Sequence, residues 1–264
     1  MGIAINTVTN DGFTMDYIRF GTGERIFVIL PGLSIKSVLG SADVIVNQYK
    51  MMADKYTIYL FDRRNEIPDT YTVRDMAADT AQAMMTLGIK GADIFGASQG
   101  GMMALVIAIE YPELVNKMVI GSSTADLKRH PSSVLEKWVQ IAKTGDRVEL
   151  SLSFGREIYP GEFFEKYEDA FEVLGKSVTD EELNRFITLA EGSSGFSVAD
   201  DLHKIKCPVL AIAAADDNVI DPVSSEEMIT AIGGDSKCFM YDQYGHAAFD
   251  MAPDYKQRMM EFLG

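Results

Sequence analysis

The sequence has little cysteine and little histidine, the two residues that most often build disulfide frameworks and metal sites. Among 264 residues there are two cysteines, Cys207 and Cys238, and three histidines. Two cysteines cannot form the dense disulfide framework of a small secreted domain. Each begins an apolar stretch typical of a strand, so we expect both to be free, buried thiols in a reducing compartment. No cofactor and no metal ion is expected.

Positive charge is also scarce. The chain carries 24 Lys and Arg against 39 Asp and Glu, which gives a formal net charge of −15. Nucleic-acid binding requires clustered cations that neutralise phosphates, and an anionic membrane surface attracts basic segments in the same way. We therefore expect neither nucleic acid nor a membrane as a partner, and the simplest role of the charge is solubility.

Long apolar runs are missing as well. The longest, residues 101–109, is far too short to span a bilayer. Residues 1–6 show no basic region followed by an apolar run, so no signal peptide is expected. A cytoplasmic protein is the resulting prediction. With 47% hydrophobic residues, the chain is long enough to bury a sizeable core.

Apolar strands alternate with helical segments along most of the chain. Asn10-Asp11-Gly12 is a strong hairpin signal between two short strands. We expect strands at 3–9, 13–20, 26–30, 57–61, 92–95, 115–120, 208–213 and 237–241, with helices at 37–53, from 72 to 88, after 98, from 224 and at the C-terminal end. Thr72…Asp75 resembles a capping box with Asp in place of Glu, and Ser224…Glu227 is expected to open the helix from 224. This alternation predicts an α/β fold in which helices cover both faces of a parallel sheet.

The alternation stops between residues 122 and 201. Helical patterns follow one another at 132–143, 146–158, 161–174 and 179–191, and two capping boxes, Ser133…Glu136 and Thr179…Glu182, open two of them. We expect 122–201 to be a helical lid inserted into a core domain of 1–121 and 202–264. Most of its aromatic side chains should form its own core and a few should line a pocket: Trp138, Phe154, Phe163, Phe164, Phe171, Phe186 and Phe196.

The strongest chemical signal is Gly96-Ala97-Ser98-Gln99-Gly100, which lies between a predicted strand and a predicted helix. A turn this sharp leaves no room for a Cβ two residues before or after the serine, and glycine solves the clash. The turn lifts the hydroxyl clear of the sheet, and the helix N-terminus favours developing negative charge. Ser98 is therefore the candidate nucleophile.

A nucleophilic serine requires a base, and three histidines are available. His130 stands beside a proline inside the insert, and His203 precedes a Lys-Ile-Lys run, so both are expected at the surface. His246 follows the last predicted strand, at the sheet edge where ligands bind in such folds. His246 is the candidate base.

The base in turn needs an orienting acid. The loop after the 208–213 strand offers Asp216, Asp217 and Asp221, of which Asp217 is the preferred candidate because it lies three residues past the strand. Asp126, after the strand that precedes the lid, is the alternative. The chain order Ser98, Asp217, His246 is the order found in α/β-hydrolases.

Together these features resemble the α/β-hydrolase-fold serine hydrolases with a helical cap. The resemblance covers essentially the whole chain and includes Pro31-Gly32, Asp62-Arg63-Arg64, the 96–100 turn and Gly245-His246. It implies a mostly parallel eight-stranded sheet and an oxyanion hole formed by the backbone N–H groups of Leu33 and Gln99.

Three positions depart from the family pattern. Pro31-Gly32 replaces the usual His-Gly, so a side chain that braces this loop is expected to be absent. Gln99 replaces the commoner Met, Leu or His, and its amide is expected to face the pocket. The alanines of 213–215 replace the usual glycine before the acid loop.

A serine at the turn excludes the aspartate-nucleophile dehalogenases and epoxide hydrolases. The resemblance implies a serine hydrolase that acts on a small-molecule ester or related acyl substrate, apolar in part. Hydrolysis of carbon–carbon bonds, a thioesterase or acyltransferase activity, and a non-catalytic ligand-binding protein on the same fold are the alternatives.

Overall fold

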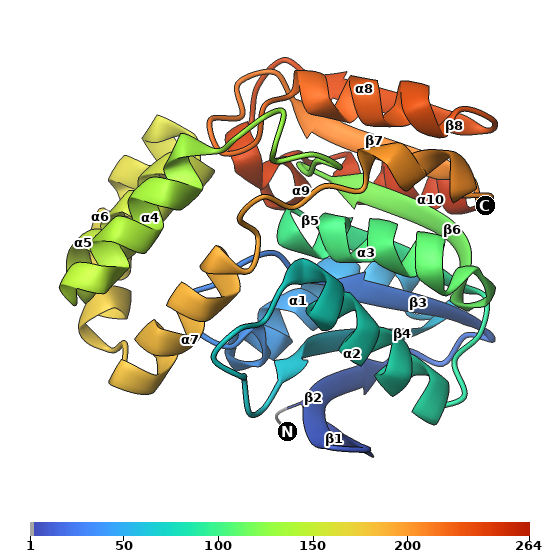
Figure 1. Cartoon of the computed structure of the whole chain (residues 1–264), viewed down its shortest axis with the longest axis horizontal. Coiled ribbons are helices and arrows are strands. Elements are labelled where there is room, and N and C mark those ends of the chain that lie inside the picture. Colours follow the sequence, from blue (N-terminus) through green and yellow to red (C-terminus); the bar gives the residue numbers. More distant parts are fainter. Residues whose placement is uncertain (1–2) are drawn as a thin grey trace.

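A single sheet organises the computed structural model, which describes residues 3–264 (Figure 1). Its eight strands lie in the order β1-β2-β4-β3-β5-β6-β7-β8. The strands are β1 (Ile5–Asn10), β2 (Phe13–Phe20), β3 (Arg25–Leu30), β4 (Tyr56–Arg64), β5 (Ala92–Ala97), β6 (Val115–Gly121), β7 (Val209–Ala214) and β8 (Ser236–Tyr241). β1 and β2 pair antiparallel, as do β2 and β4, and every other pairing is parallel. The predicted α/β-hydrolase fold and its mostly parallel eight-stranded sheet are confirmed.

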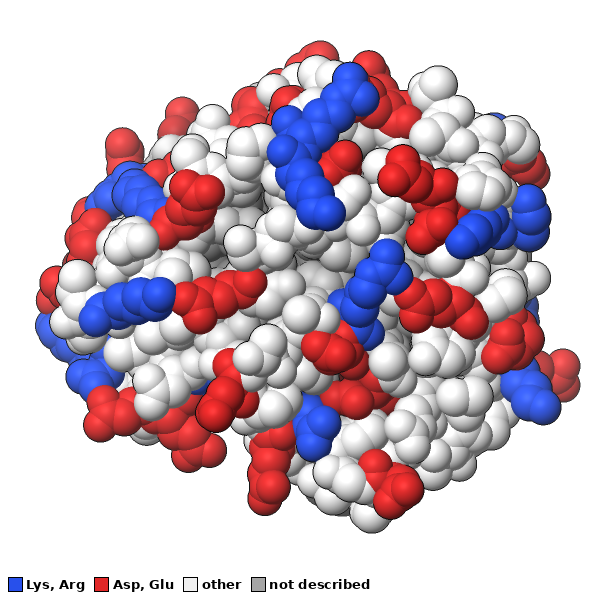
Figure 2. Space-filling view, viewed as in Figure 1, with Lys and Arg blue, Asp and Glu red and all other residues white. Residues whose placement is uncertain are grey.

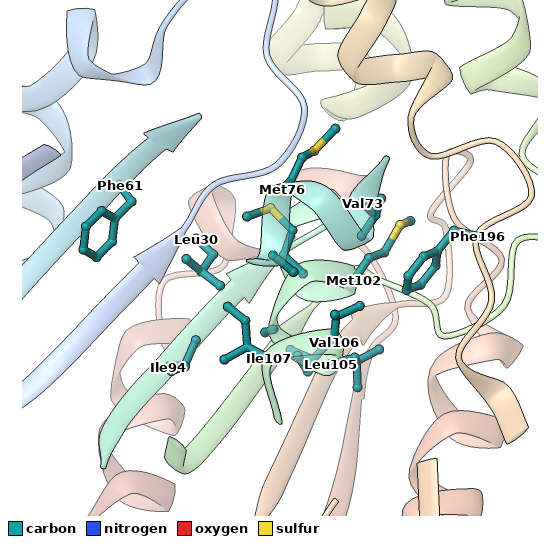
Figure 3. Close-up of a cluster of buried hydrophobic side chains, with 14 of the residues drawn as sticks. Leu30, Phe61, Val73, Met76, Ile94, Met102, Leu105, Val106, Ile107 and Phe196 are labelled. Atoms are coloured by element: carbon teal, nitrogen blue, oxygen red, sulfur yellow. The ribbon is translucent and has the colours of Figure 1, made fainter. Parts of the chain in front are cut away.

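Helices cover both faces of the sheet. One face packs against α2 (Val73–Thr86), α3 (Gln99–Glu110) and α8 (Val223–Ile232), and the other packs against α1 (Ala42–Tyr49), α9 (Ala248–Met251) and α10 (Tyr255–Leu263). Because both faces are covered, β5 and β7 are buried over their whole length. Figure 3 shows Ile107 of α3 close to Leu30 and Ile94 of the central strands. The predicted helix over 37–53 is broken, because short 3-10 turns flank α1.

Four helices follow β6 and precede β7. They are α4 (Ser133–Thr144), α5 (Arg147–Ile158), α6 (Gly161–Lys176) and α7 (Asp180–Glu191). In Figure 1, α4, α5 and α6 stand together beside the sheet. Within residues 3–264, no helix has both the length and the apolar character needed to cross a membrane.

The helix caps correct two sequence predictions. The capping box of Thr179 and Glu182 is present, but the box predicted for Ser133 is wrong. Ser132 caps α4 instead, since its hydroxyl accepts a hydrogen bond from the Leu135 N–H at 3.2 Å. Ser224 does not cap α8 either, because its hydroxyl donates to a backbone carbonyl.

The glycines that flank Ser98 are required by close packing. A Cβ on Gly96 would lie 2.4 Å from the Gly100 carbonyl oxygen, and a Cβ on Gly100 would lie 2.0 Å from the Leu30 carbonyl oxygen. These contacts involve backbone atoms that cannot rotate away. The end of β3, the turn at Ser98 and the start of α3 are therefore packed directly against one another.

Replacing Gly100 by alanine is expected to lower the free energy of unfolding by about 3 kcal/mol, because the added methyl group overpacks the β3 backbone. Urea unfolding followed by circular dichroism measures the change. Gly161→Ala is the matched control: a Cβ at Gly161 meets nothing within 4 Å, and the residue begins α6. Equal stabilities of the two variants would contradict the packing argument.

Candidate active site

Ser98 occupies a strained turn between β5 and α3. Its backbone angles are φ 51° and ψ −121°, a conformation that non-glycine residues rarely adopt. Backbone hydrogen bonds hold it on both sides. The Ser98 N–H donates to the Gly121 carbonyl at 2.8 Å, and the Ser98 carbonyl accepts from the N–H groups of Gly101 at 2.8 Å and Met102 at 3.2 Å. The Ser123 hydroxyl also donates to the Ser98 carbonyl, at 2.7 Å. Strain that the surrounding structure maintains is typical of functional sites.

His246 and Asp217 form a buried pair between the loops that follow β8 and β7. The His246 Nδ1 lies 2.8 Å from Asp217 Oδ2 and 3.1 Å from Oδ1, with side chains 4% and 1% exposed. Asp217 Oδ1 also accepts hydrogen bonds from the N–H groups of Val219 and Ile220. A carboxylate at Nδ1 keeps the proton there and leaves Nε2 free to accept one.

The other aspartates near this pair have different partners. Asp216 accepts a hydrogen bond from the Gly245 N–H at 2.8 Å, which joins the two loops beside the histidine. Asp126, the alternative acid, accepts from the backbone N–H groups of Lys128 and Arg129 at 3.0 and 3.2 Å and so stabilises a local turn. The structure therefore brings Asp217, and not Asp126, to His246.

The two remaining histidines lie elsewhere. His130 bridges Glu227 at 2.9 Å and Asp221 at 3.0 Å, and these hydrogen bonds, that of Glu227 first, raise its pKa. The exposed His203 contacts the Asp200 carbonyl at 2.9 Å. Both histidines therefore interact with groups at the protein surface.

Ser98 and His246 line one cavity of about 590 Å³, together with Gly32 and Leu33. Five aromatic side chains of residues 122–201 also line it: Trp138, Phe154, Tyr159, Phe163 and Phe171. Asp217 and Gln99 do not line the cavity. Over residues 3–264 no hydrogen bond joins the Ser98 hydroxyl to His246; in ligand-free enzymes such contacts commonly tighten only when substrate binds.

The loop of residues 31–33 lies directly against Ser98. A Cβ added to Gly32 would come within 3.2 Å of the Ser98 Cβ and 3.3 Å of the Ala97 carbonyl oxygen. In the described part of the chain, the backbone N–H groups of Leu33 and Gln99 have no protein acceptor. Two free donors on segments that flank Ser98 are available to an oxygen atom of a ligand.

The side chain of Gln99 does not face the cavity, so that prediction was wrong. The side chain is buried, and its amide nitrogen donates to the Leu189 carbonyl at 2.7 Å and to the Ser193 hydroxyl at 2.8 Å. Its amide oxygen accepts from Arg63 at 3.0 Å. A buried amide requires partners for each polar atom, and the end of α7 and the end of β4 supply them.

Arg63 braces the loop that was expected to lack a supporting side chain. Its buried guanidinium donates to the Pro31 carbonyl at 2.9 Å as well as to Gln99. Burial lowers the pKa of Arg63 to about 10, although the neighbouring Asp62 opposes the shift. Asp62 also pairs with Arg185 of α7 at 2.6 Å. The sequence signal was present in the charged triplet 62–64, which ends an apolar strand.

Comparisons with known proteins agree with this architecture. Residues 27–253 match the family described as alpha/beta hydrolase fold. The chain is 22% identical to the serine hydrolase BPHL of Mus musculus over 97% of this chain and 85% of that protein. It is 26% identical to RutD of Escherichia coli O81, whose name proposes a carbamate as its substrate, over 87% of each.

Solved structures show the same fold. MGS-M2, an alpha/beta hydrolase enzyme from a deep-sea metagenome library of the Medee basin, superposes with a TM-score of 0.86 at 23% identity, covering 98% of this chain and 97% of that one. The enol-lactonase of Burkholderia xenovorans LB400 gives 0.84 at 17% identity, over 98% and 99%. The family match spans most of the chain and agrees with the observed sheet. The chain therefore belongs to the α/β-hydrolase fold family, as a hydrolase of that family.

Proposed function

We propose that this hydrolase cleaves a carboxylic ester or a related acyl substrate through a triad of Ser98, His246 and Asp217. The observation that carries the proposal is the buried pair of Asp217 and His246, whose imidazole lines the same cavity as Ser98. A serine at a strained turn, a histidine in its cavity and a carboxylate behind the histidine are the components of acyl transfer.

The reaction follows from these positions. The Ser98 hydroxyl oxygen attacks the acyl carbon while His246 Nε2 takes the hydroxyl proton. Asp217 stabilises the imidazolium, and the N–H groups of Leu33 and Gln99 bind the oxyanion, each worth about 3 kcal/mol. His246 then gives its proton to the departing alcohol oxygen, and the acyl group remains bonded to Ser98 as an ester. A water molecule, deprotonated by His246, attacks the acyl carbon of this ester. The acid departs, and His246 returns the proton to the Ser98 oxygen.

A panel of p-nitrophenyl esters of increasing acyl length tests the proposal, with a thioester and a vinylogous diketone as competing substrates. We expect the esters to give the highest kcat/KM. A marked preference for the diketone would favour carbon–carbon bond hydrolysis, and a preference for the thioester would favour a thioesterase. Failure to hydrolyse any of them would favour a ligand-binding role.

We further propose that residues 122–201 act as a lid that sets specificity, because five of their aromatic side chains line the cavity beside Ser98. The partner is then a small, partly apolar acyl substrate. Neither nucleic acid nor a membrane is proposed as a partner: Figure 2 shows acidic and basic side chains interspersed over one face, in keeping with the net charge of −15. Two free cysteines favour a cytoplasmic location.

Arg63 is proposed to position the oxyanion hole, since it links the loop of Leu33 to the residue that carries the second donor. Arg63→Met is expected to lower kcat by about 10- to 100-fold with KM changed by less than about threefold, because the donors matter most in the transition state. Arg63→Lys, which keeps one donor, should recover part of kcat.

Arg64→Met is the matched control for this prediction. Arg64 points to the surface side of the same strand end, where it contacts Asp79 at 3.5 Å and the Gly12 carbonyl at 3.1 Å. A rise in KM with unchanged kcat would show that Arg63 does not act through the oxyanion hole. An equal fall in kcat in Arg64→Met would show the same.

A further inference from the structure

Two charged side chains line the cavity beside Ser98 and His246, Lys36 and Asp250. Lys36 is neutralised within the protein. Its ammonium lies 3.3 Å from Glu182 and donates to the Ser177 carbonyl at 3.1 Å. The Lys36 ammonium is therefore already paired with Glu182 of α7 and with the segment before that helix.

Asp250 has no such partner. Within residues 3–264, no cationic nitrogen lies within 4 Å of its carboxylate, and its one hydrogen bond, from the Gln48 side-chain amide, is long at 3.4 Å. The nearby ammonium of Lys256 donates instead to the Phe249 carbonyl. Most of the acceptor positions of the Asp250 carboxylate are thus open to a ligand in the cavity.

Asp250 lies at the cavity and is exposed to solvent, so a ligand can reach its carboxylate. Burial of the surrounding groups raises the pKa of Asp250, and Lys256 only partly opposes this shift. Burial and then the charge of Asp250 raise the pKa values of Tyr49 and Tyr159, so both phenols lie within its field. A cationic ligand beside Asp250 would favour the charged form of its carboxylate.

Aromatic rings supply the second part of a cation site. Tyr159 and Phe249 line the cavity together with Asp250, as does Tyr49, whose ring already has the Lys256 ammonium 5.6 Å from its centroid. The Tyr159 ring stacks on Phe163 with centroids 4.7 Å apart. A carboxylate beside aromatic rings is the arrangement that binds alkylammonium groups, since the ring faces and the carboxylate both attract positive charge.

We propose that Asp250 is the anionic centre of a cation subsite, and that this enzyme prefers ester substrates that carry an alkylammonium group. The proposal rests on the ester hydrolysis proposed above. Asp250 follows His246 by four residues and lies within the short helix α9, about one helical turn away. The cationic group would therefore lie only a few bonds from the acyl carbon.

Pairs of substrates that differ only in charge test the subsite. The p-nitrophenyl esters of 4-(trimethylammonio)butanoate and 5,5-dimethylhexanoate place the charge on the acyl side. Acetylcholine and 3,3-dimethylbutyl acetate place it on the alcohol side. In at least one pair, we expect the cationic ester to have a kcat/KM about tenfold above that of its neutral isostere, and this ratio to collapse toward unity in Asp250→Asn.

Asp242→Asn is the matched control, because Asp242 is exposed, lies on the loop before His246 and does not line the cavity. It removes the same charge and should keep the ratio. Hydrolysis of the neutral esters without a cationic preference would overturn the subsite and leave the proposed function standing. A preference that survives in Asp250→Asn would overturn the assignment to Asp250.

Binding provides a readout that requires no turnover. Benzyltrimethylammonium, titrated calorimetrically into the protein, should bind with a Kd that rises about tenfold in Asp250→Asn and stays unchanged in Asp242→Asn. Absence of binding to the wild-type protein would contradict the subsite whichever bond the enzyme cleaves. Absence of hydrolysis with intact binding would contradict only the proposed function.

Discussion

Replacement of Ser98 by alanine is expected to lower kcat/KM for an activated ester by about 10⁴- to 10⁶-fold. The change removes the nucleophile but keeps the oxyanion donors and the cavity, so a residual rate above that in water should remain. Ester hydrolysis followed spectrophotometrically measures the loss, and circular dichroism verifies that the variant is folded.

Ser194→Ala serves as the control for this substitution, since Ser194 is exposed on the segment after α7. Its activity should match that of the wild-type protein. Undiminished hydrolysis by folded Ser98→Ala protein would remove Ser98 from the mechanism, and with it the proposed triad.

Asp217→Asn is expected to lower kcat by about 10³- to 10⁴-fold. An asparagine amide can donate to Nδ1 of His246, which would place the imidazole proton on Nε2, where the base must be free to accept. The side chain keeps its size, so the buried site should remain packed. The same ester assay measures the effect.

Asp126→Asn is the control here, because Asp126 is the other candidate acid and forms only its own turn. We expect it to change kcat by less than about threefold, as for most surface substitutions. A large loss in the Asp126 variant with little loss in Asp217→Asn would reverse the assignment of the acid.

Local sequence signals predicted much of the fold. The central strands are apolar throughout because helices cover both faces of the sheet, and this made them visible as short runs. The caps at Thr72 and Thr179 form as expected, since both partners of each box lie within four residues. Ser132 and Ser133 are adjacent serines with similar capping ability, so the choice between them depended on how the chain enters α4.

The candidate site was predictable where each residue follows a strand. Ser98, Asp217 and His246 come after β5, β7 and β8, whose carboxyl ends meet at one edge of a parallel sheet. The orientation of Gln99 was predicted wrongly and the role of Arg63 was missed, because their partners are distant in sequence. The Gln99 side-chain amide donates a hydrogen bond to the Leu189 carbonyl, 90 residues away. Such a contact depends on how residues 122–201 pack against the rest of the chain.

The most direct test of the proposed triad is covalent labelling of the folded protein with a fluorophosphonate, followed by peptide mass spectrometry. This reagent phosphonylates a serine whose hydroxyl is activated by a neighbouring base. We expect a single adduct, on Ser98, that is lost when the protein is unfolded before labelling and is strongly reduced in Asp217→Asn. No adduct on Ser98 in the folded wild-type protein, or a single adduct on a different serine, would contradict the proposal that Ser98 is the nucleophile.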